Sequence, residues 1–438
     1  MTRNDLRRKL LAPASPLPLA MFRAVFGACM LWTIGYFLRG DRVSSMFTSA
    51  SFHLTYYGFG WVHPMGQFGM SLLFLALGIL AAAVMVGLFA RPAALLFALG
   101  FGYVFLIDKT NYVNHNYLFV LLSFLLAWTP SGAALSIDAL LRNKRVSVPA
   151  WAYSLFRFQF GVVYVFAGIA KLNADWLSGK ILGGTLAWES GLPVVGRYMK
   201  APWMGAAAAW SGMAIDLLCV PLLLHKKARW PALIAVAAFH IANDRLFTIG
   251  MFPWVMLAGT ACFFFADVIG RLEAPLPAAV EARPVRSRAG AAALAAYALI
   301  QVALPLRHLA YPGDVNWTQE GSTFAWRMML NEKHASARFF VRDPASGMEW
   351  EATGANYLTA KQREKVPEDP DMILQFCHHL ADEWREAGFP GVEVRTEALV
   401  SVNGRPFMPI ADGSVDLAAM PRKLWHERWI TPGPAAAP

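Results

Sequence analysis

The sequence predicts an α-helical bundle that spans a membrane, followed by a smaller β-rich α+β domain in water. Of the 438 residues, 56% are hydrophobic and only 16% are charged, whereas soluble domains carry about 25% charge. Apolar blocks long enough to cross a bilayer fill the first 310 residues, and beyond Tyr311 these blocks stop and charge rises. We therefore expect a membrane domain over 1–310 and a soluble domain over 311–438.

The membrane domain is predicted to hold about nine transmembrane helices, since roughly 20 apolar residues cross a hydrocarbon core of ~30 Å. The segments are residues 17–38, 66–89, 92–108, 116–130, 150–170, 205–224, 230–243, 248–268 and 289–308. The fourth and seventh are short and must tilt or extend to cross. No small-residue cleavage site follows the first segment, so we expect the basic N-terminus to be a retained cytoplasmic anchor.

Positive charge in alternate loops sets the predicted orientation. The basic residues are Arg3, Arg7, Arg8 and Lys9 at the N-terminus, then Arg91, then Arg142, Lys144 and Arg145, then Lys226, Lys227 and Arg229, then Arg271, Arg283, Arg286 and Arg288. The positive-inside rule places these loops in the cytoplasm. Nine crossings then put the C-terminal domain outside, and an even number of crossings would reverse that placement.

The C-terminal domain shows both strand and helix patterns. Residues 337–343 and 348–353 are typical of strands, and residues 369–388 have apolar positions at helical spacing and end in a glycine. Asn403 and Gly404 form a dipeptide typical of a type I′ hairpin turn between two strands. These patterns predict the β-rich α+β domain.

Charge and cysteine usage exclude several classes of function. The net charge is +10, but the basic residues gather at helix ends and form no stripe interleaved with aromatics, so we expect no nucleic-acid partner. The four cysteines lack metal-ligand spacing, and we predict neither a metal site nor a disulfide scaffold.

Arg23 and Arg157 lie in predicted spans and are expected to reach the cytoplasmic interface. Residues 274–290 are typical of a flexible connector.

Polar side chains within apolar segments are the candidate functional residues, because burying them in a membrane is costly. Asn114 and His115 precede the fourth segment, and Lys171 closes the fifth. His240 and Asn243 in the seventh are three residues apart and therefore share one helix face. All of them fall toward the outer ends of their helices. This one-sided clustering indicates a shared cavity.

Each candidate also has a purely structural interpretation. His115 would be a solvated or capping residue, and His240 would form a hydrogen-bonded pair with Asn243 that joins helices. Lys171 would extend to the interface beside tryptophans. Its functional interpretation is a desolvated amine that accepts a proton. An ion pair with Asp175, four residues on, would oppose that function.

Long motifs occur in the same order as in one known family. They are NHNYL (114–118), VYVFAGIAKLNADWLSG (163–179), the HIAND…LFTIGMFPWVML block (240–257), YPGDVNWTQEGSTFAWRMML (311–330) and SVDLAAM (414–420). With these motifs the chain resembles the vitamin K-dependent γ-glutamyl carboxylase family, within the wider group of horizontally transferred transmembrane domains. The resemblance covers nearly the whole chain, and ordered motifs of this length are far more specific than one short pattern.

The resemblance implies an enzyme that couples oxygenation of reduced vitamin K to carboxylation of glutamate. In this family a lysine deprotonates the hydroquinone, which reacts with O2 to give a very strong base. That base removes a γ-proton from glutamate, CO2 adds to the carbanion, and the quinone leaves as its epoxide. Lys171 matches the family's base. His115 and His240 match histidines at its quinone site, accompanied by Asn114 and Asn243. No metal is implied.

The resemblance also implies partners and a location. The substrate would be a glutamate-containing peptide or protein, and the cofactor would be phylloquinone or menaquinone in its hydroquinone form. The short chain, rich in alanine and arginine, predicts a bacterial inner-membrane protein that uses menaquinone.

Two other functions stay open: a quinol epoxidase or oxidase of the same fold without carboxylation, and a non-enzymatic membrane carrier or sensor. A carrier is expected to show an internal repeat or paired broken helices, and the sequence shows neither.

Overall fold

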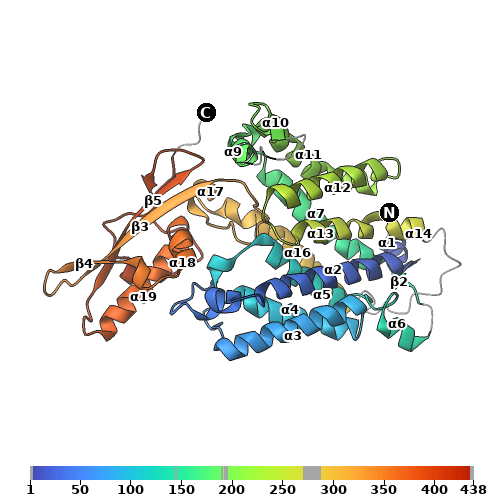
Figure 1. Cartoon of the computed structure of the whole chain (residues 1–438), viewed down its shortest axis with the longest axis horizontal. Helices are drawn as coiled ribbons and strands as arrows, with labels where there is room; N and C mark the ends of the chain where they lie inside the picture. Colours follow the sequence, from blue (N-terminus) through green and yellow to red (C-terminus); the bar gives the residue numbers. More distant parts are fainter. Residues whose placement is uncertain (1–2, 144–145, 189–190, 192–195, 270–287, 435–438) are drawn as a thin grey trace. The chain divides into compact units, whose positions relative to one another are not determined.

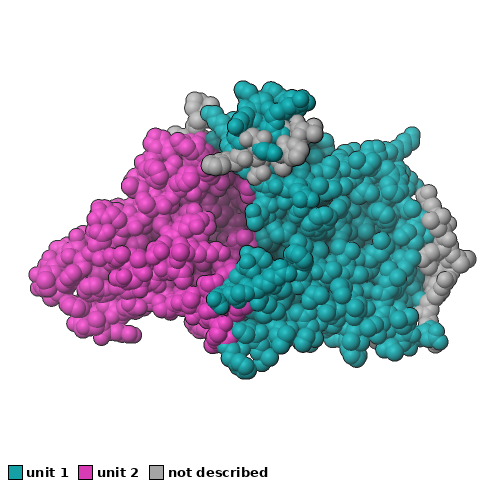
Figure 2. All heavy atoms as spheres, viewed as in Figure 1, with its two compact units in different colours: residues 1–42, 68–103, 115–303 teal, residues 43–67, 104–114, 304–438 magenta. Residues whose placement is uncertain are grey.

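A computed structural model describes the chain except residues 1–2, 144–145, 189–190, 192–195, 270–287 and 435–438. The chain forms two compact units, coloured separately in Figure 2. The first comprises residues 1–42, 68–103 and 115–303, and the second comprises 43–67, 104–114 and 304–438. Two loops from the N-terminal half therefore belong to the second unit. Most of the predicted connector, residues 274–287, lies outside the described residues, and so do Lys144 and Arg145.

Within the described residues, helices occupy all the segments that the sequence predicts to cross the membrane (Figure 1). They are α2 (Leu17–Phe37), α3 (Gln67–Val86), α4 (Ala90–Leu106), α5 (Asn114–Trp128), α7 (Ala150–Ala170), α11 (Met204–Leu224), α12 (Arg229–Leu246), α13 (Phe252–Gly259) with α14 (Ala261–Ile269), and α16 (Arg288–Leu306). Of these, six spans are long and apolar enough to cross a membrane, namely α2, α3, α7, α11, α13 with α14, and α16. The predicted fold class is confirmed, and the crossing of α4, α5 and α12 stays a prediction.

The surface of α3 shows why this unit requires a membrane. Phe68, Leu72, Leu75 and Ile79 are exposed, and they recur at the spacing of one helix face. The opposite face of α3 is buried against the bundle. Soluble monomers rarely expose a contiguous apolar stripe of this kind, whereas hydrocarbon is a suitable solvent for it.

Shorter elements join the long helices of the first unit. They are α1 (Arg3–Leu11), β1 (Pro13–Ala14), α6 (Ile137–Arg142), β2 (Val148–Pro149), α8 (Ala174–Leu177), α9 (Lys180–Trp188) and α10 (Gly196–Met199). Strand β1 pairs with β2 in antiparallel orientation. Helix α11 packs against α7, α9 and α12. It is therefore the shared neighbour of the helices that carry Tyr164 and His240.

The second unit contains a four-stranded antiparallel sheet in the order β4-β3-β5-β6. The strands are β3 (Lys333–Arg342), β4 (Glu349–Ala352), β5 (Glu393–Val402) and β6 (Met408–Pro409). Asn403 and Gly404 have φ values of +55° and +73°, and Arg405 N donates to Val402 O at 3.2 Å. Positive φ at both central positions is what a type I′ turn requires, so the predicted turn is confirmed.

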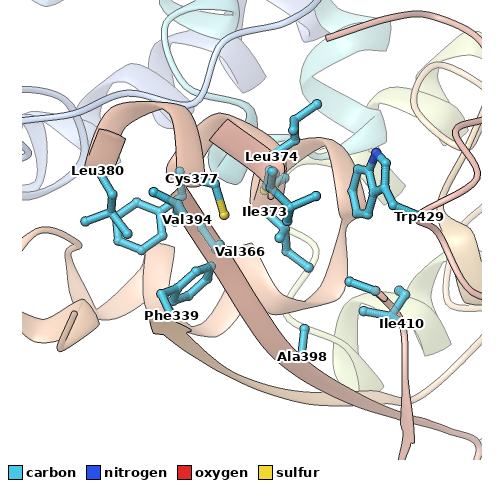
Figure 3. Packing of buried hydrophobic residues seen from close by; sticks show 14 of the residues in the cluster. Phe339, Val366, Ile373, Leu374, Cys377, Leu380, Val394, Ala398, Ile410 and Trp429 are labelled. Atoms are coloured by element: carbon cyan, nitrogen blue, oxygen red, sulfur yellow. The ribbon is translucent and has the colours of Figure 1, made fainter. Parts of the chain in front are cut away.

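Helix α19 (Pro370–Glu386) packs on this sheet and closes the core of the second unit (Figure 3). Phe339 of β3 and Phe376 of α19 meet edge to face, with ring centroids 4.7 Å apart. Val394 and Ala398 project from alternate positions of β5 into the same cluster. The short helices α17 (Val315–Thr318) and α18 (Ala360–Lys365) complete the unit. The amphipathic helix predicted at 369–388 is thus confirmed.

A charged network attaches the two N-terminal loops of the second unit to α19. The Asp371 carboxylate pairs with Lys109 Nζ at 2.9 Å and with Arg422 Nε at 2.6 Å. Arg422 Nη2 also donates to Thr55 O at 2.6 Å. Although burial acts in the opposite direction, Lys109 and Arg422 lower the pKa of Asp371 to about 2.

We expect Asp371→Asn to destabilise the second unit in a pH-dependent way. The folded-state pKa lies below the ordinary value of 3.8, so the stabilisation is fully present above pH 4 and disappears as pH falls through about 2. The shift corresponds to about 2 kcal/mol at neutral pH. Thermal unfolding of the detergent-solubilised protein should show a lower Tm for the variant at pH 7 and convergence with wild type near pH 2. Glu397→Gln, which removes an exposed carboxylate, is the control, and an equal loss from both variants would contradict the prediction.

Candidate active site

The end of α7 fixes the backbone that carries Lys171. The helix ends at Lys171, whose N–H donates to Gly168 O at 3.1 Å. Asn173 then caps α8: its Oδ1 accepts from Trp176 N at 2.9 Å, and its Nδ2 donates to Ala170 O at 2.9 Å. An asparagine cap of this kind satisfies the free N–H groups of a new helix. Asn173 therefore ties the end of α7 to the start of α8.

The Lys171 side chain is buried, with 7% of its surface exposed. Its Nζ donates to Asp216 Oδ2 at 2.7 Å and to Ala167 O at 3.3 Å, and it lies 5.3 Å from the centroid of the Trp176 ring. A buried ammonium needs such partners because burial of an unpaired charge costs several kcal/mol. Lys171 is thus held inside the bundle by its partners. The structural interpretation required the side chain to extend to the interface, and it does not do so.

Asp216 is a site residue that the sequence interpretation missed. It projects from the buried face of α11 and is itself buried. The carboxylate considered for Lys171 was Asp175, four residues away, but the carboxylate that pairs with Nζ is Asp216, 45 positions away. The signal was available, since Asp216 is a carboxylate inside an apolar segment, where ionisable residues are rare and functional.

Gly168 permits the approach of α11 to α7 that the ion pair requires. A Cβ at Gly168 would lie 2.7 Å from Leu217 Cγ and 3.1 Å from Leu217 N. Leu217 is next to Asp216, and Gly168 is three residues before Lys171, so this close contact of the two helices is beside the ion pair. At Gly161, two turns earlier on α7, a Cβ would meet Val220 Cγ1 at an ordinary 3.9 Å.

We expect Gly168→Ala to lower turnover about tenfold, because separating α7 from α11 by a few tenths of an ångström lengthens the Lys171–Asp216 contact and small misplacements of catalytic groups are costly. Overpacking should also lower stability by about 1–3 kcal/mol. Gly161→Ala is the matched control, since it adds the same methyl group to the same helix where space exists. Turnover in the proposed reaction, described below, is the measurement. Equal activity of the two variants would show that the close approach is unimportant.

His240 forms the second part of the site. It is 2% exposed, and its Nε2 lies 2.7 Å from Tyr164 Oη. Among the described residues, no hydrogen-bond partner reaches His240 Nδ1, although this atom is buried. Tyr164 and Lys171 are seven residues apart on α7, which places them two turns, or ~10 Å, apart on one face. A tyrosine that donates to Nε2 leaves an N–H at Nδ1 to donate to a ligand.

Phe252 connects His240 with His115. The Phe252 ring centroid lies 6.4 Å from that of His240 and 6.2 Å from that of His115. His115 projects from the first turn of α5 and also contacts Phe119, at 5.6 Å. The structure therefore brings His115 and His240 to the same aromatic side chain, which offers a flat apolar surface between two polar rings.

The two candidate asparagines have different environments. Asn243 lies one turn after His240 on α12 and is half-buried. Asn114 belongs to the second unit, where its Oδ1 accepts from Tyr112 Oη at 2.8 Å and its Nδ2 donates to Arg327 O at 3.2 Å. The side chain of Asn114 therefore anchors the first residue of α5.

The two arginines within the spans are held by backbone carbonyl groups. Arg157 Nε donates to Cys262 O at 2.8 Å. Arg23 has no exposed surface, and its Nη2 donates to Leu135 O at 2.5 Å. Arg23 therefore does not reach solvent, because a loop covers its guanidinium, and its position at the cytoplasmic interface stays a prediction. Gly87 is required here, since a Cβ would lie 1.6 Å from Arg23 Nη1.

Comparison with protein families identifies the two parts of the chain. Residues 11–267, more than half of the chain, match the HTTM domain. Residues 286–436 match the vitamin K-dependent gamma-carboxylase, lumenal domain. The chain belongs to the vitamin K-dependent gamma-carboxylase family. No solved structure matches the chain. Lys171, Asp216 and both histidines of the site lie within the HTTM match of this carboxylase-family membrane protein.

The residues of the site fit the reduced vitamin K that the family uses. A hydroquinone has a flat ring with two oxygens, which need an apolar surface and hydrogen-bond donors. Phe252 supplies the surface, and the unpartnered Nδ1 of His240 is a buried polar atom that needs a partner. A buried polar group left without a hydrogen bond costs about 1–3 kcal/mol, so a ligand oxygen at this atom would be stabilising.

Proposed function

We propose that this protein is a vitamin K hydroquinone-dependent γ-glutamyl carboxylase that also forms vitamin K epoxide. The observation that carries the proposal is the buried Lys171–Asp216 pair between α7 and α11. Helix α11 also packs against α12, which carries His240 with its unpartnered Nδ1. Family membership supports it, since both the membrane part and the lumenal part match. The reaction consumes O2 and CO2.

The chemistry explains why the site lies inside a membrane bundle. The γ-proton of glutamate is far too weakly acidic for any side-chain base. Reduced vitamin K, when bound, supplies a sufficiently strong base through its reaction with O2, and it is released as the epoxide. A base of that strength must be kept from water, and the apolar helices around the site exclude water.

Lys171 and Asp216 act on a proton in this proposal. The proton on Lys171 Nζ moves across the 2.7 Å hydrogen bond to Asp216 Oδ2, which leaves a neutral lysine beside a neutral carboxylic acid. Nζ would then act as general base and accept the proton of a hydroxyl group of the bound hydroquinone, so that an O–H bond breaks as the N–H bond forms. Burial in a low-polarity environment lowers the free-energy cost of converting the ion pair into this neutral pair. Arginine cannot replace lysine here because it does not release its proton at accessible pH.

The other residues of the site hold and orient the quinone. His240 donates through Nδ1 while Tyr164 fixes its ring and its tautomer at Nε2. His115 on α5 and Phe252 on α13, whose rings contact each other, would contact the quinone ring, and Asn243 is a further polar group on the His240 helix. We also assign Asn114 to the quinone site, on the strength of the family motif NHNYL alone. Hydrogen bonds of this kind also stabilise an oxyanion as negative charge develops.

The second unit would bind the glutamate-containing peptide or protein, as a lumenal domain of this family. We place it outside the cell membrane, with the N-terminus in the cytoplasm, on the strength of the basic loops and an odd number of crossings. An isoprenoid quinone enters from the lipid. We place the protein in the bacterial inner membrane, where the available isoprenoid quinone would be menaquinone.

The decisive test uses the purified protein in nanodiscs with reduced vitamin K, O2, labelled CO2 and a glutamate-containing peptide. Formation of epoxide together with fixed label is the expected result. Epoxide without fixed label would instead support a quinol epoxidase of the same fold and would reject the carboxylase. Neither product, from protein shown to be folded by its thermal unfolding, would favour a membrane carrier.

Labelling of a cysteine introduced at Thr353 tests the orientation. Thr353 is exposed in the second unit, and the native cysteines are all buried and free, so background labelling should be low. We expect an impermeant maleimide to modify this cysteine in intact cells. A cysteine at Lys226, in an exposed basic loop, should react only after permeabilisation. Protection of the Thr353 site would reverse the proposed orientation.

A further inference from the structure

A cavity of about 470 Å³ lies in the first unit, where α4 begins and α5 ends. This volume is within the range of small-ligand pockets. The cavity is separate from the candidate active site and shares no residue with it. The residues on which its chemistry depends are Phe89, Arg91, Pro92, Leu141, Arg142 and Val146.

The polar part of the cavity is positively charged. Arg91 is in the first turn of α4, and its Nε donates to Ala127 O at 2.9 Å, which holds the guanidinium in the wall. Arg142, at the end of α6, is exposed. Asp138 also lines the cavity, but its two carboxylate oxygens accept from Phe89 N and Ala90 N, each at 2.8 Å. Two arginines and one carboxylate give the lining a net positive charge, which favours an anionic ligand.

The rim of the cavity is apolar and exposed. Phe89 and Leu141, which line the cavity, are 67% and 76% exposed, and Leu140 on α6 and Leu135 just before this helix are also exposed. Large apolar side chains next to basic ones at the ends of membrane helices are typical of an interface with lipid. A soluble ligand would need only the arginines and would leave these leucines in water.

An apolar path leads from the cavity along α4. Pro92 lines the cavity, and Leu95, Leu96 and Leu99 follow at spacings of three, four and seven residues, which places them on one helix face. All three leucines are exposed. A molecule with an anionic head in the cavity would therefore have an apolar surface for its chains along the same helix.

We propose that this cavity binds the headgroup of an anionic phospholipid, whose acyl chains lie along the Leu95–Leu99 face of α4. The phosphate contacts Arg91 and Arg142, with which it forms charge-assisted hydrogen bonds. Basic pockets between membrane helices are suited to such headgroups. This proposal is independent of the carboxylase reaction.

Native mass spectrometry of the full-length protein in detergent, titrated with phosphatidylglycerol or phosphatidylcholine, tests the proposal. We expect wild type to prefer the anionic lipid. One basic residue near an anionic surface contributes about a factor of five in affinity. The Arg91→Gln/Arg142→Gln variant should therefore bind phosphatidylglycerol roughly thirtyfold more weakly, with phosphatidylcholine unchanged. Lys226→Gln/Lys227→Gln removes two exposed charges elsewhere and should behave as wild type.

Two further measurements keep the test decisive. Arg142→Glu alone, at an exposed position, should also lower the affinity for phosphatidylglycerol, with a melting temperature close to that of wild type. Glycerol 1-phosphate, which has the headgroup without the chains, should bind far more weakly than the lipid. Equal affinity for the two lipids, an unchanged arginine variant, or glycerol 1-phosphate that binds as tightly as the lipid would each overturn the proposal.

Discussion

Lys171→Ala is expected to lower kcat for epoxide formation about 10²- to 10⁴-fold, the range that a general base contributes. The lysine is buried, and its Nζ contacts Asp216 Oδ2 at 2.7 Å, so truncation removes the amine and leaves a cavity in its place. A small external amine, added to the assay, should enter this cavity and restore part of the rate. Full activity of the variant would contradict the assignment of Lys171 as the base.

The Lys171→Arg variant distinguishes two roles of Lys171, that of a base and that of a positive charge that only stabilises the structure. Arginine keeps the positive charge and can pair with the Asp216 carboxylate, but it does not release a proton at accessible pH. We therefore expect this variant to unfold at a temperature close to that of wild type and yet to form no epoxide, with or without external amine. An active arginine variant would show that only the charge is needed.

Asp216→Asn is expected to lower both stability and turnover. Removal of one partner of a buried ion pair typically costs about 3–5 kcal/mol, because the remaining charge is left uncompensated. In the proposed mechanism the variant also lacks the group that accepts the proton from Lys171 Nζ. Thermal unfolding in detergent and the rate of epoxide formation are the two measurements. Wild-type values for both would remove Asp216 from the site.

The double variant Lys171→Met/Asp216→Leu distinguishes the two roles of Asp216. Replacement of a whole buried pair by apolar residues of similar volume is often neutral or stabilising. We expect the double variant to recover the melting temperature lost by Asp216→Asn but to form no epoxide. If it regained turnover as well, the pair would have only a structural role.

Several features of the fold followed from local pattern alone. Apolar blocks of membrane length coincide with helices, and the segment 369–388 is an amphipathic helix on a sheet. The turn at Asn403 and Gly404 was predictable because few residues other than asparagine and glycine adopt positive φ. In each case the deciding physics, hydrophobic spacing or backbone sterics, acts between residues that are close in the chain.

Other features depended on contacts that no local pattern contains. Residues 43–67 and 104–114 join the second unit through Thr55, Lys109, Asp371 and Arg422. Arg23 is covered by a loop more than 100 residues away in the chain. Such pairings depend on where distant segments meet, and the free energy that selects them is the packing of the whole unit.

Local sequence was enough to single out Lys171, His115 and His240, because each places a costly polar group in or beside an apolar segment. The tertiary structure alone decided their partners. Asp216 pairs with Lys171 because Gly168 lets α11 approach α7 closely, and Tyr164 reaches His240 across the α7–α12 contact. Burial cost is a property of a residue and its neighbours in sequence, whereas the choice of partner depends on how helices pack against one another.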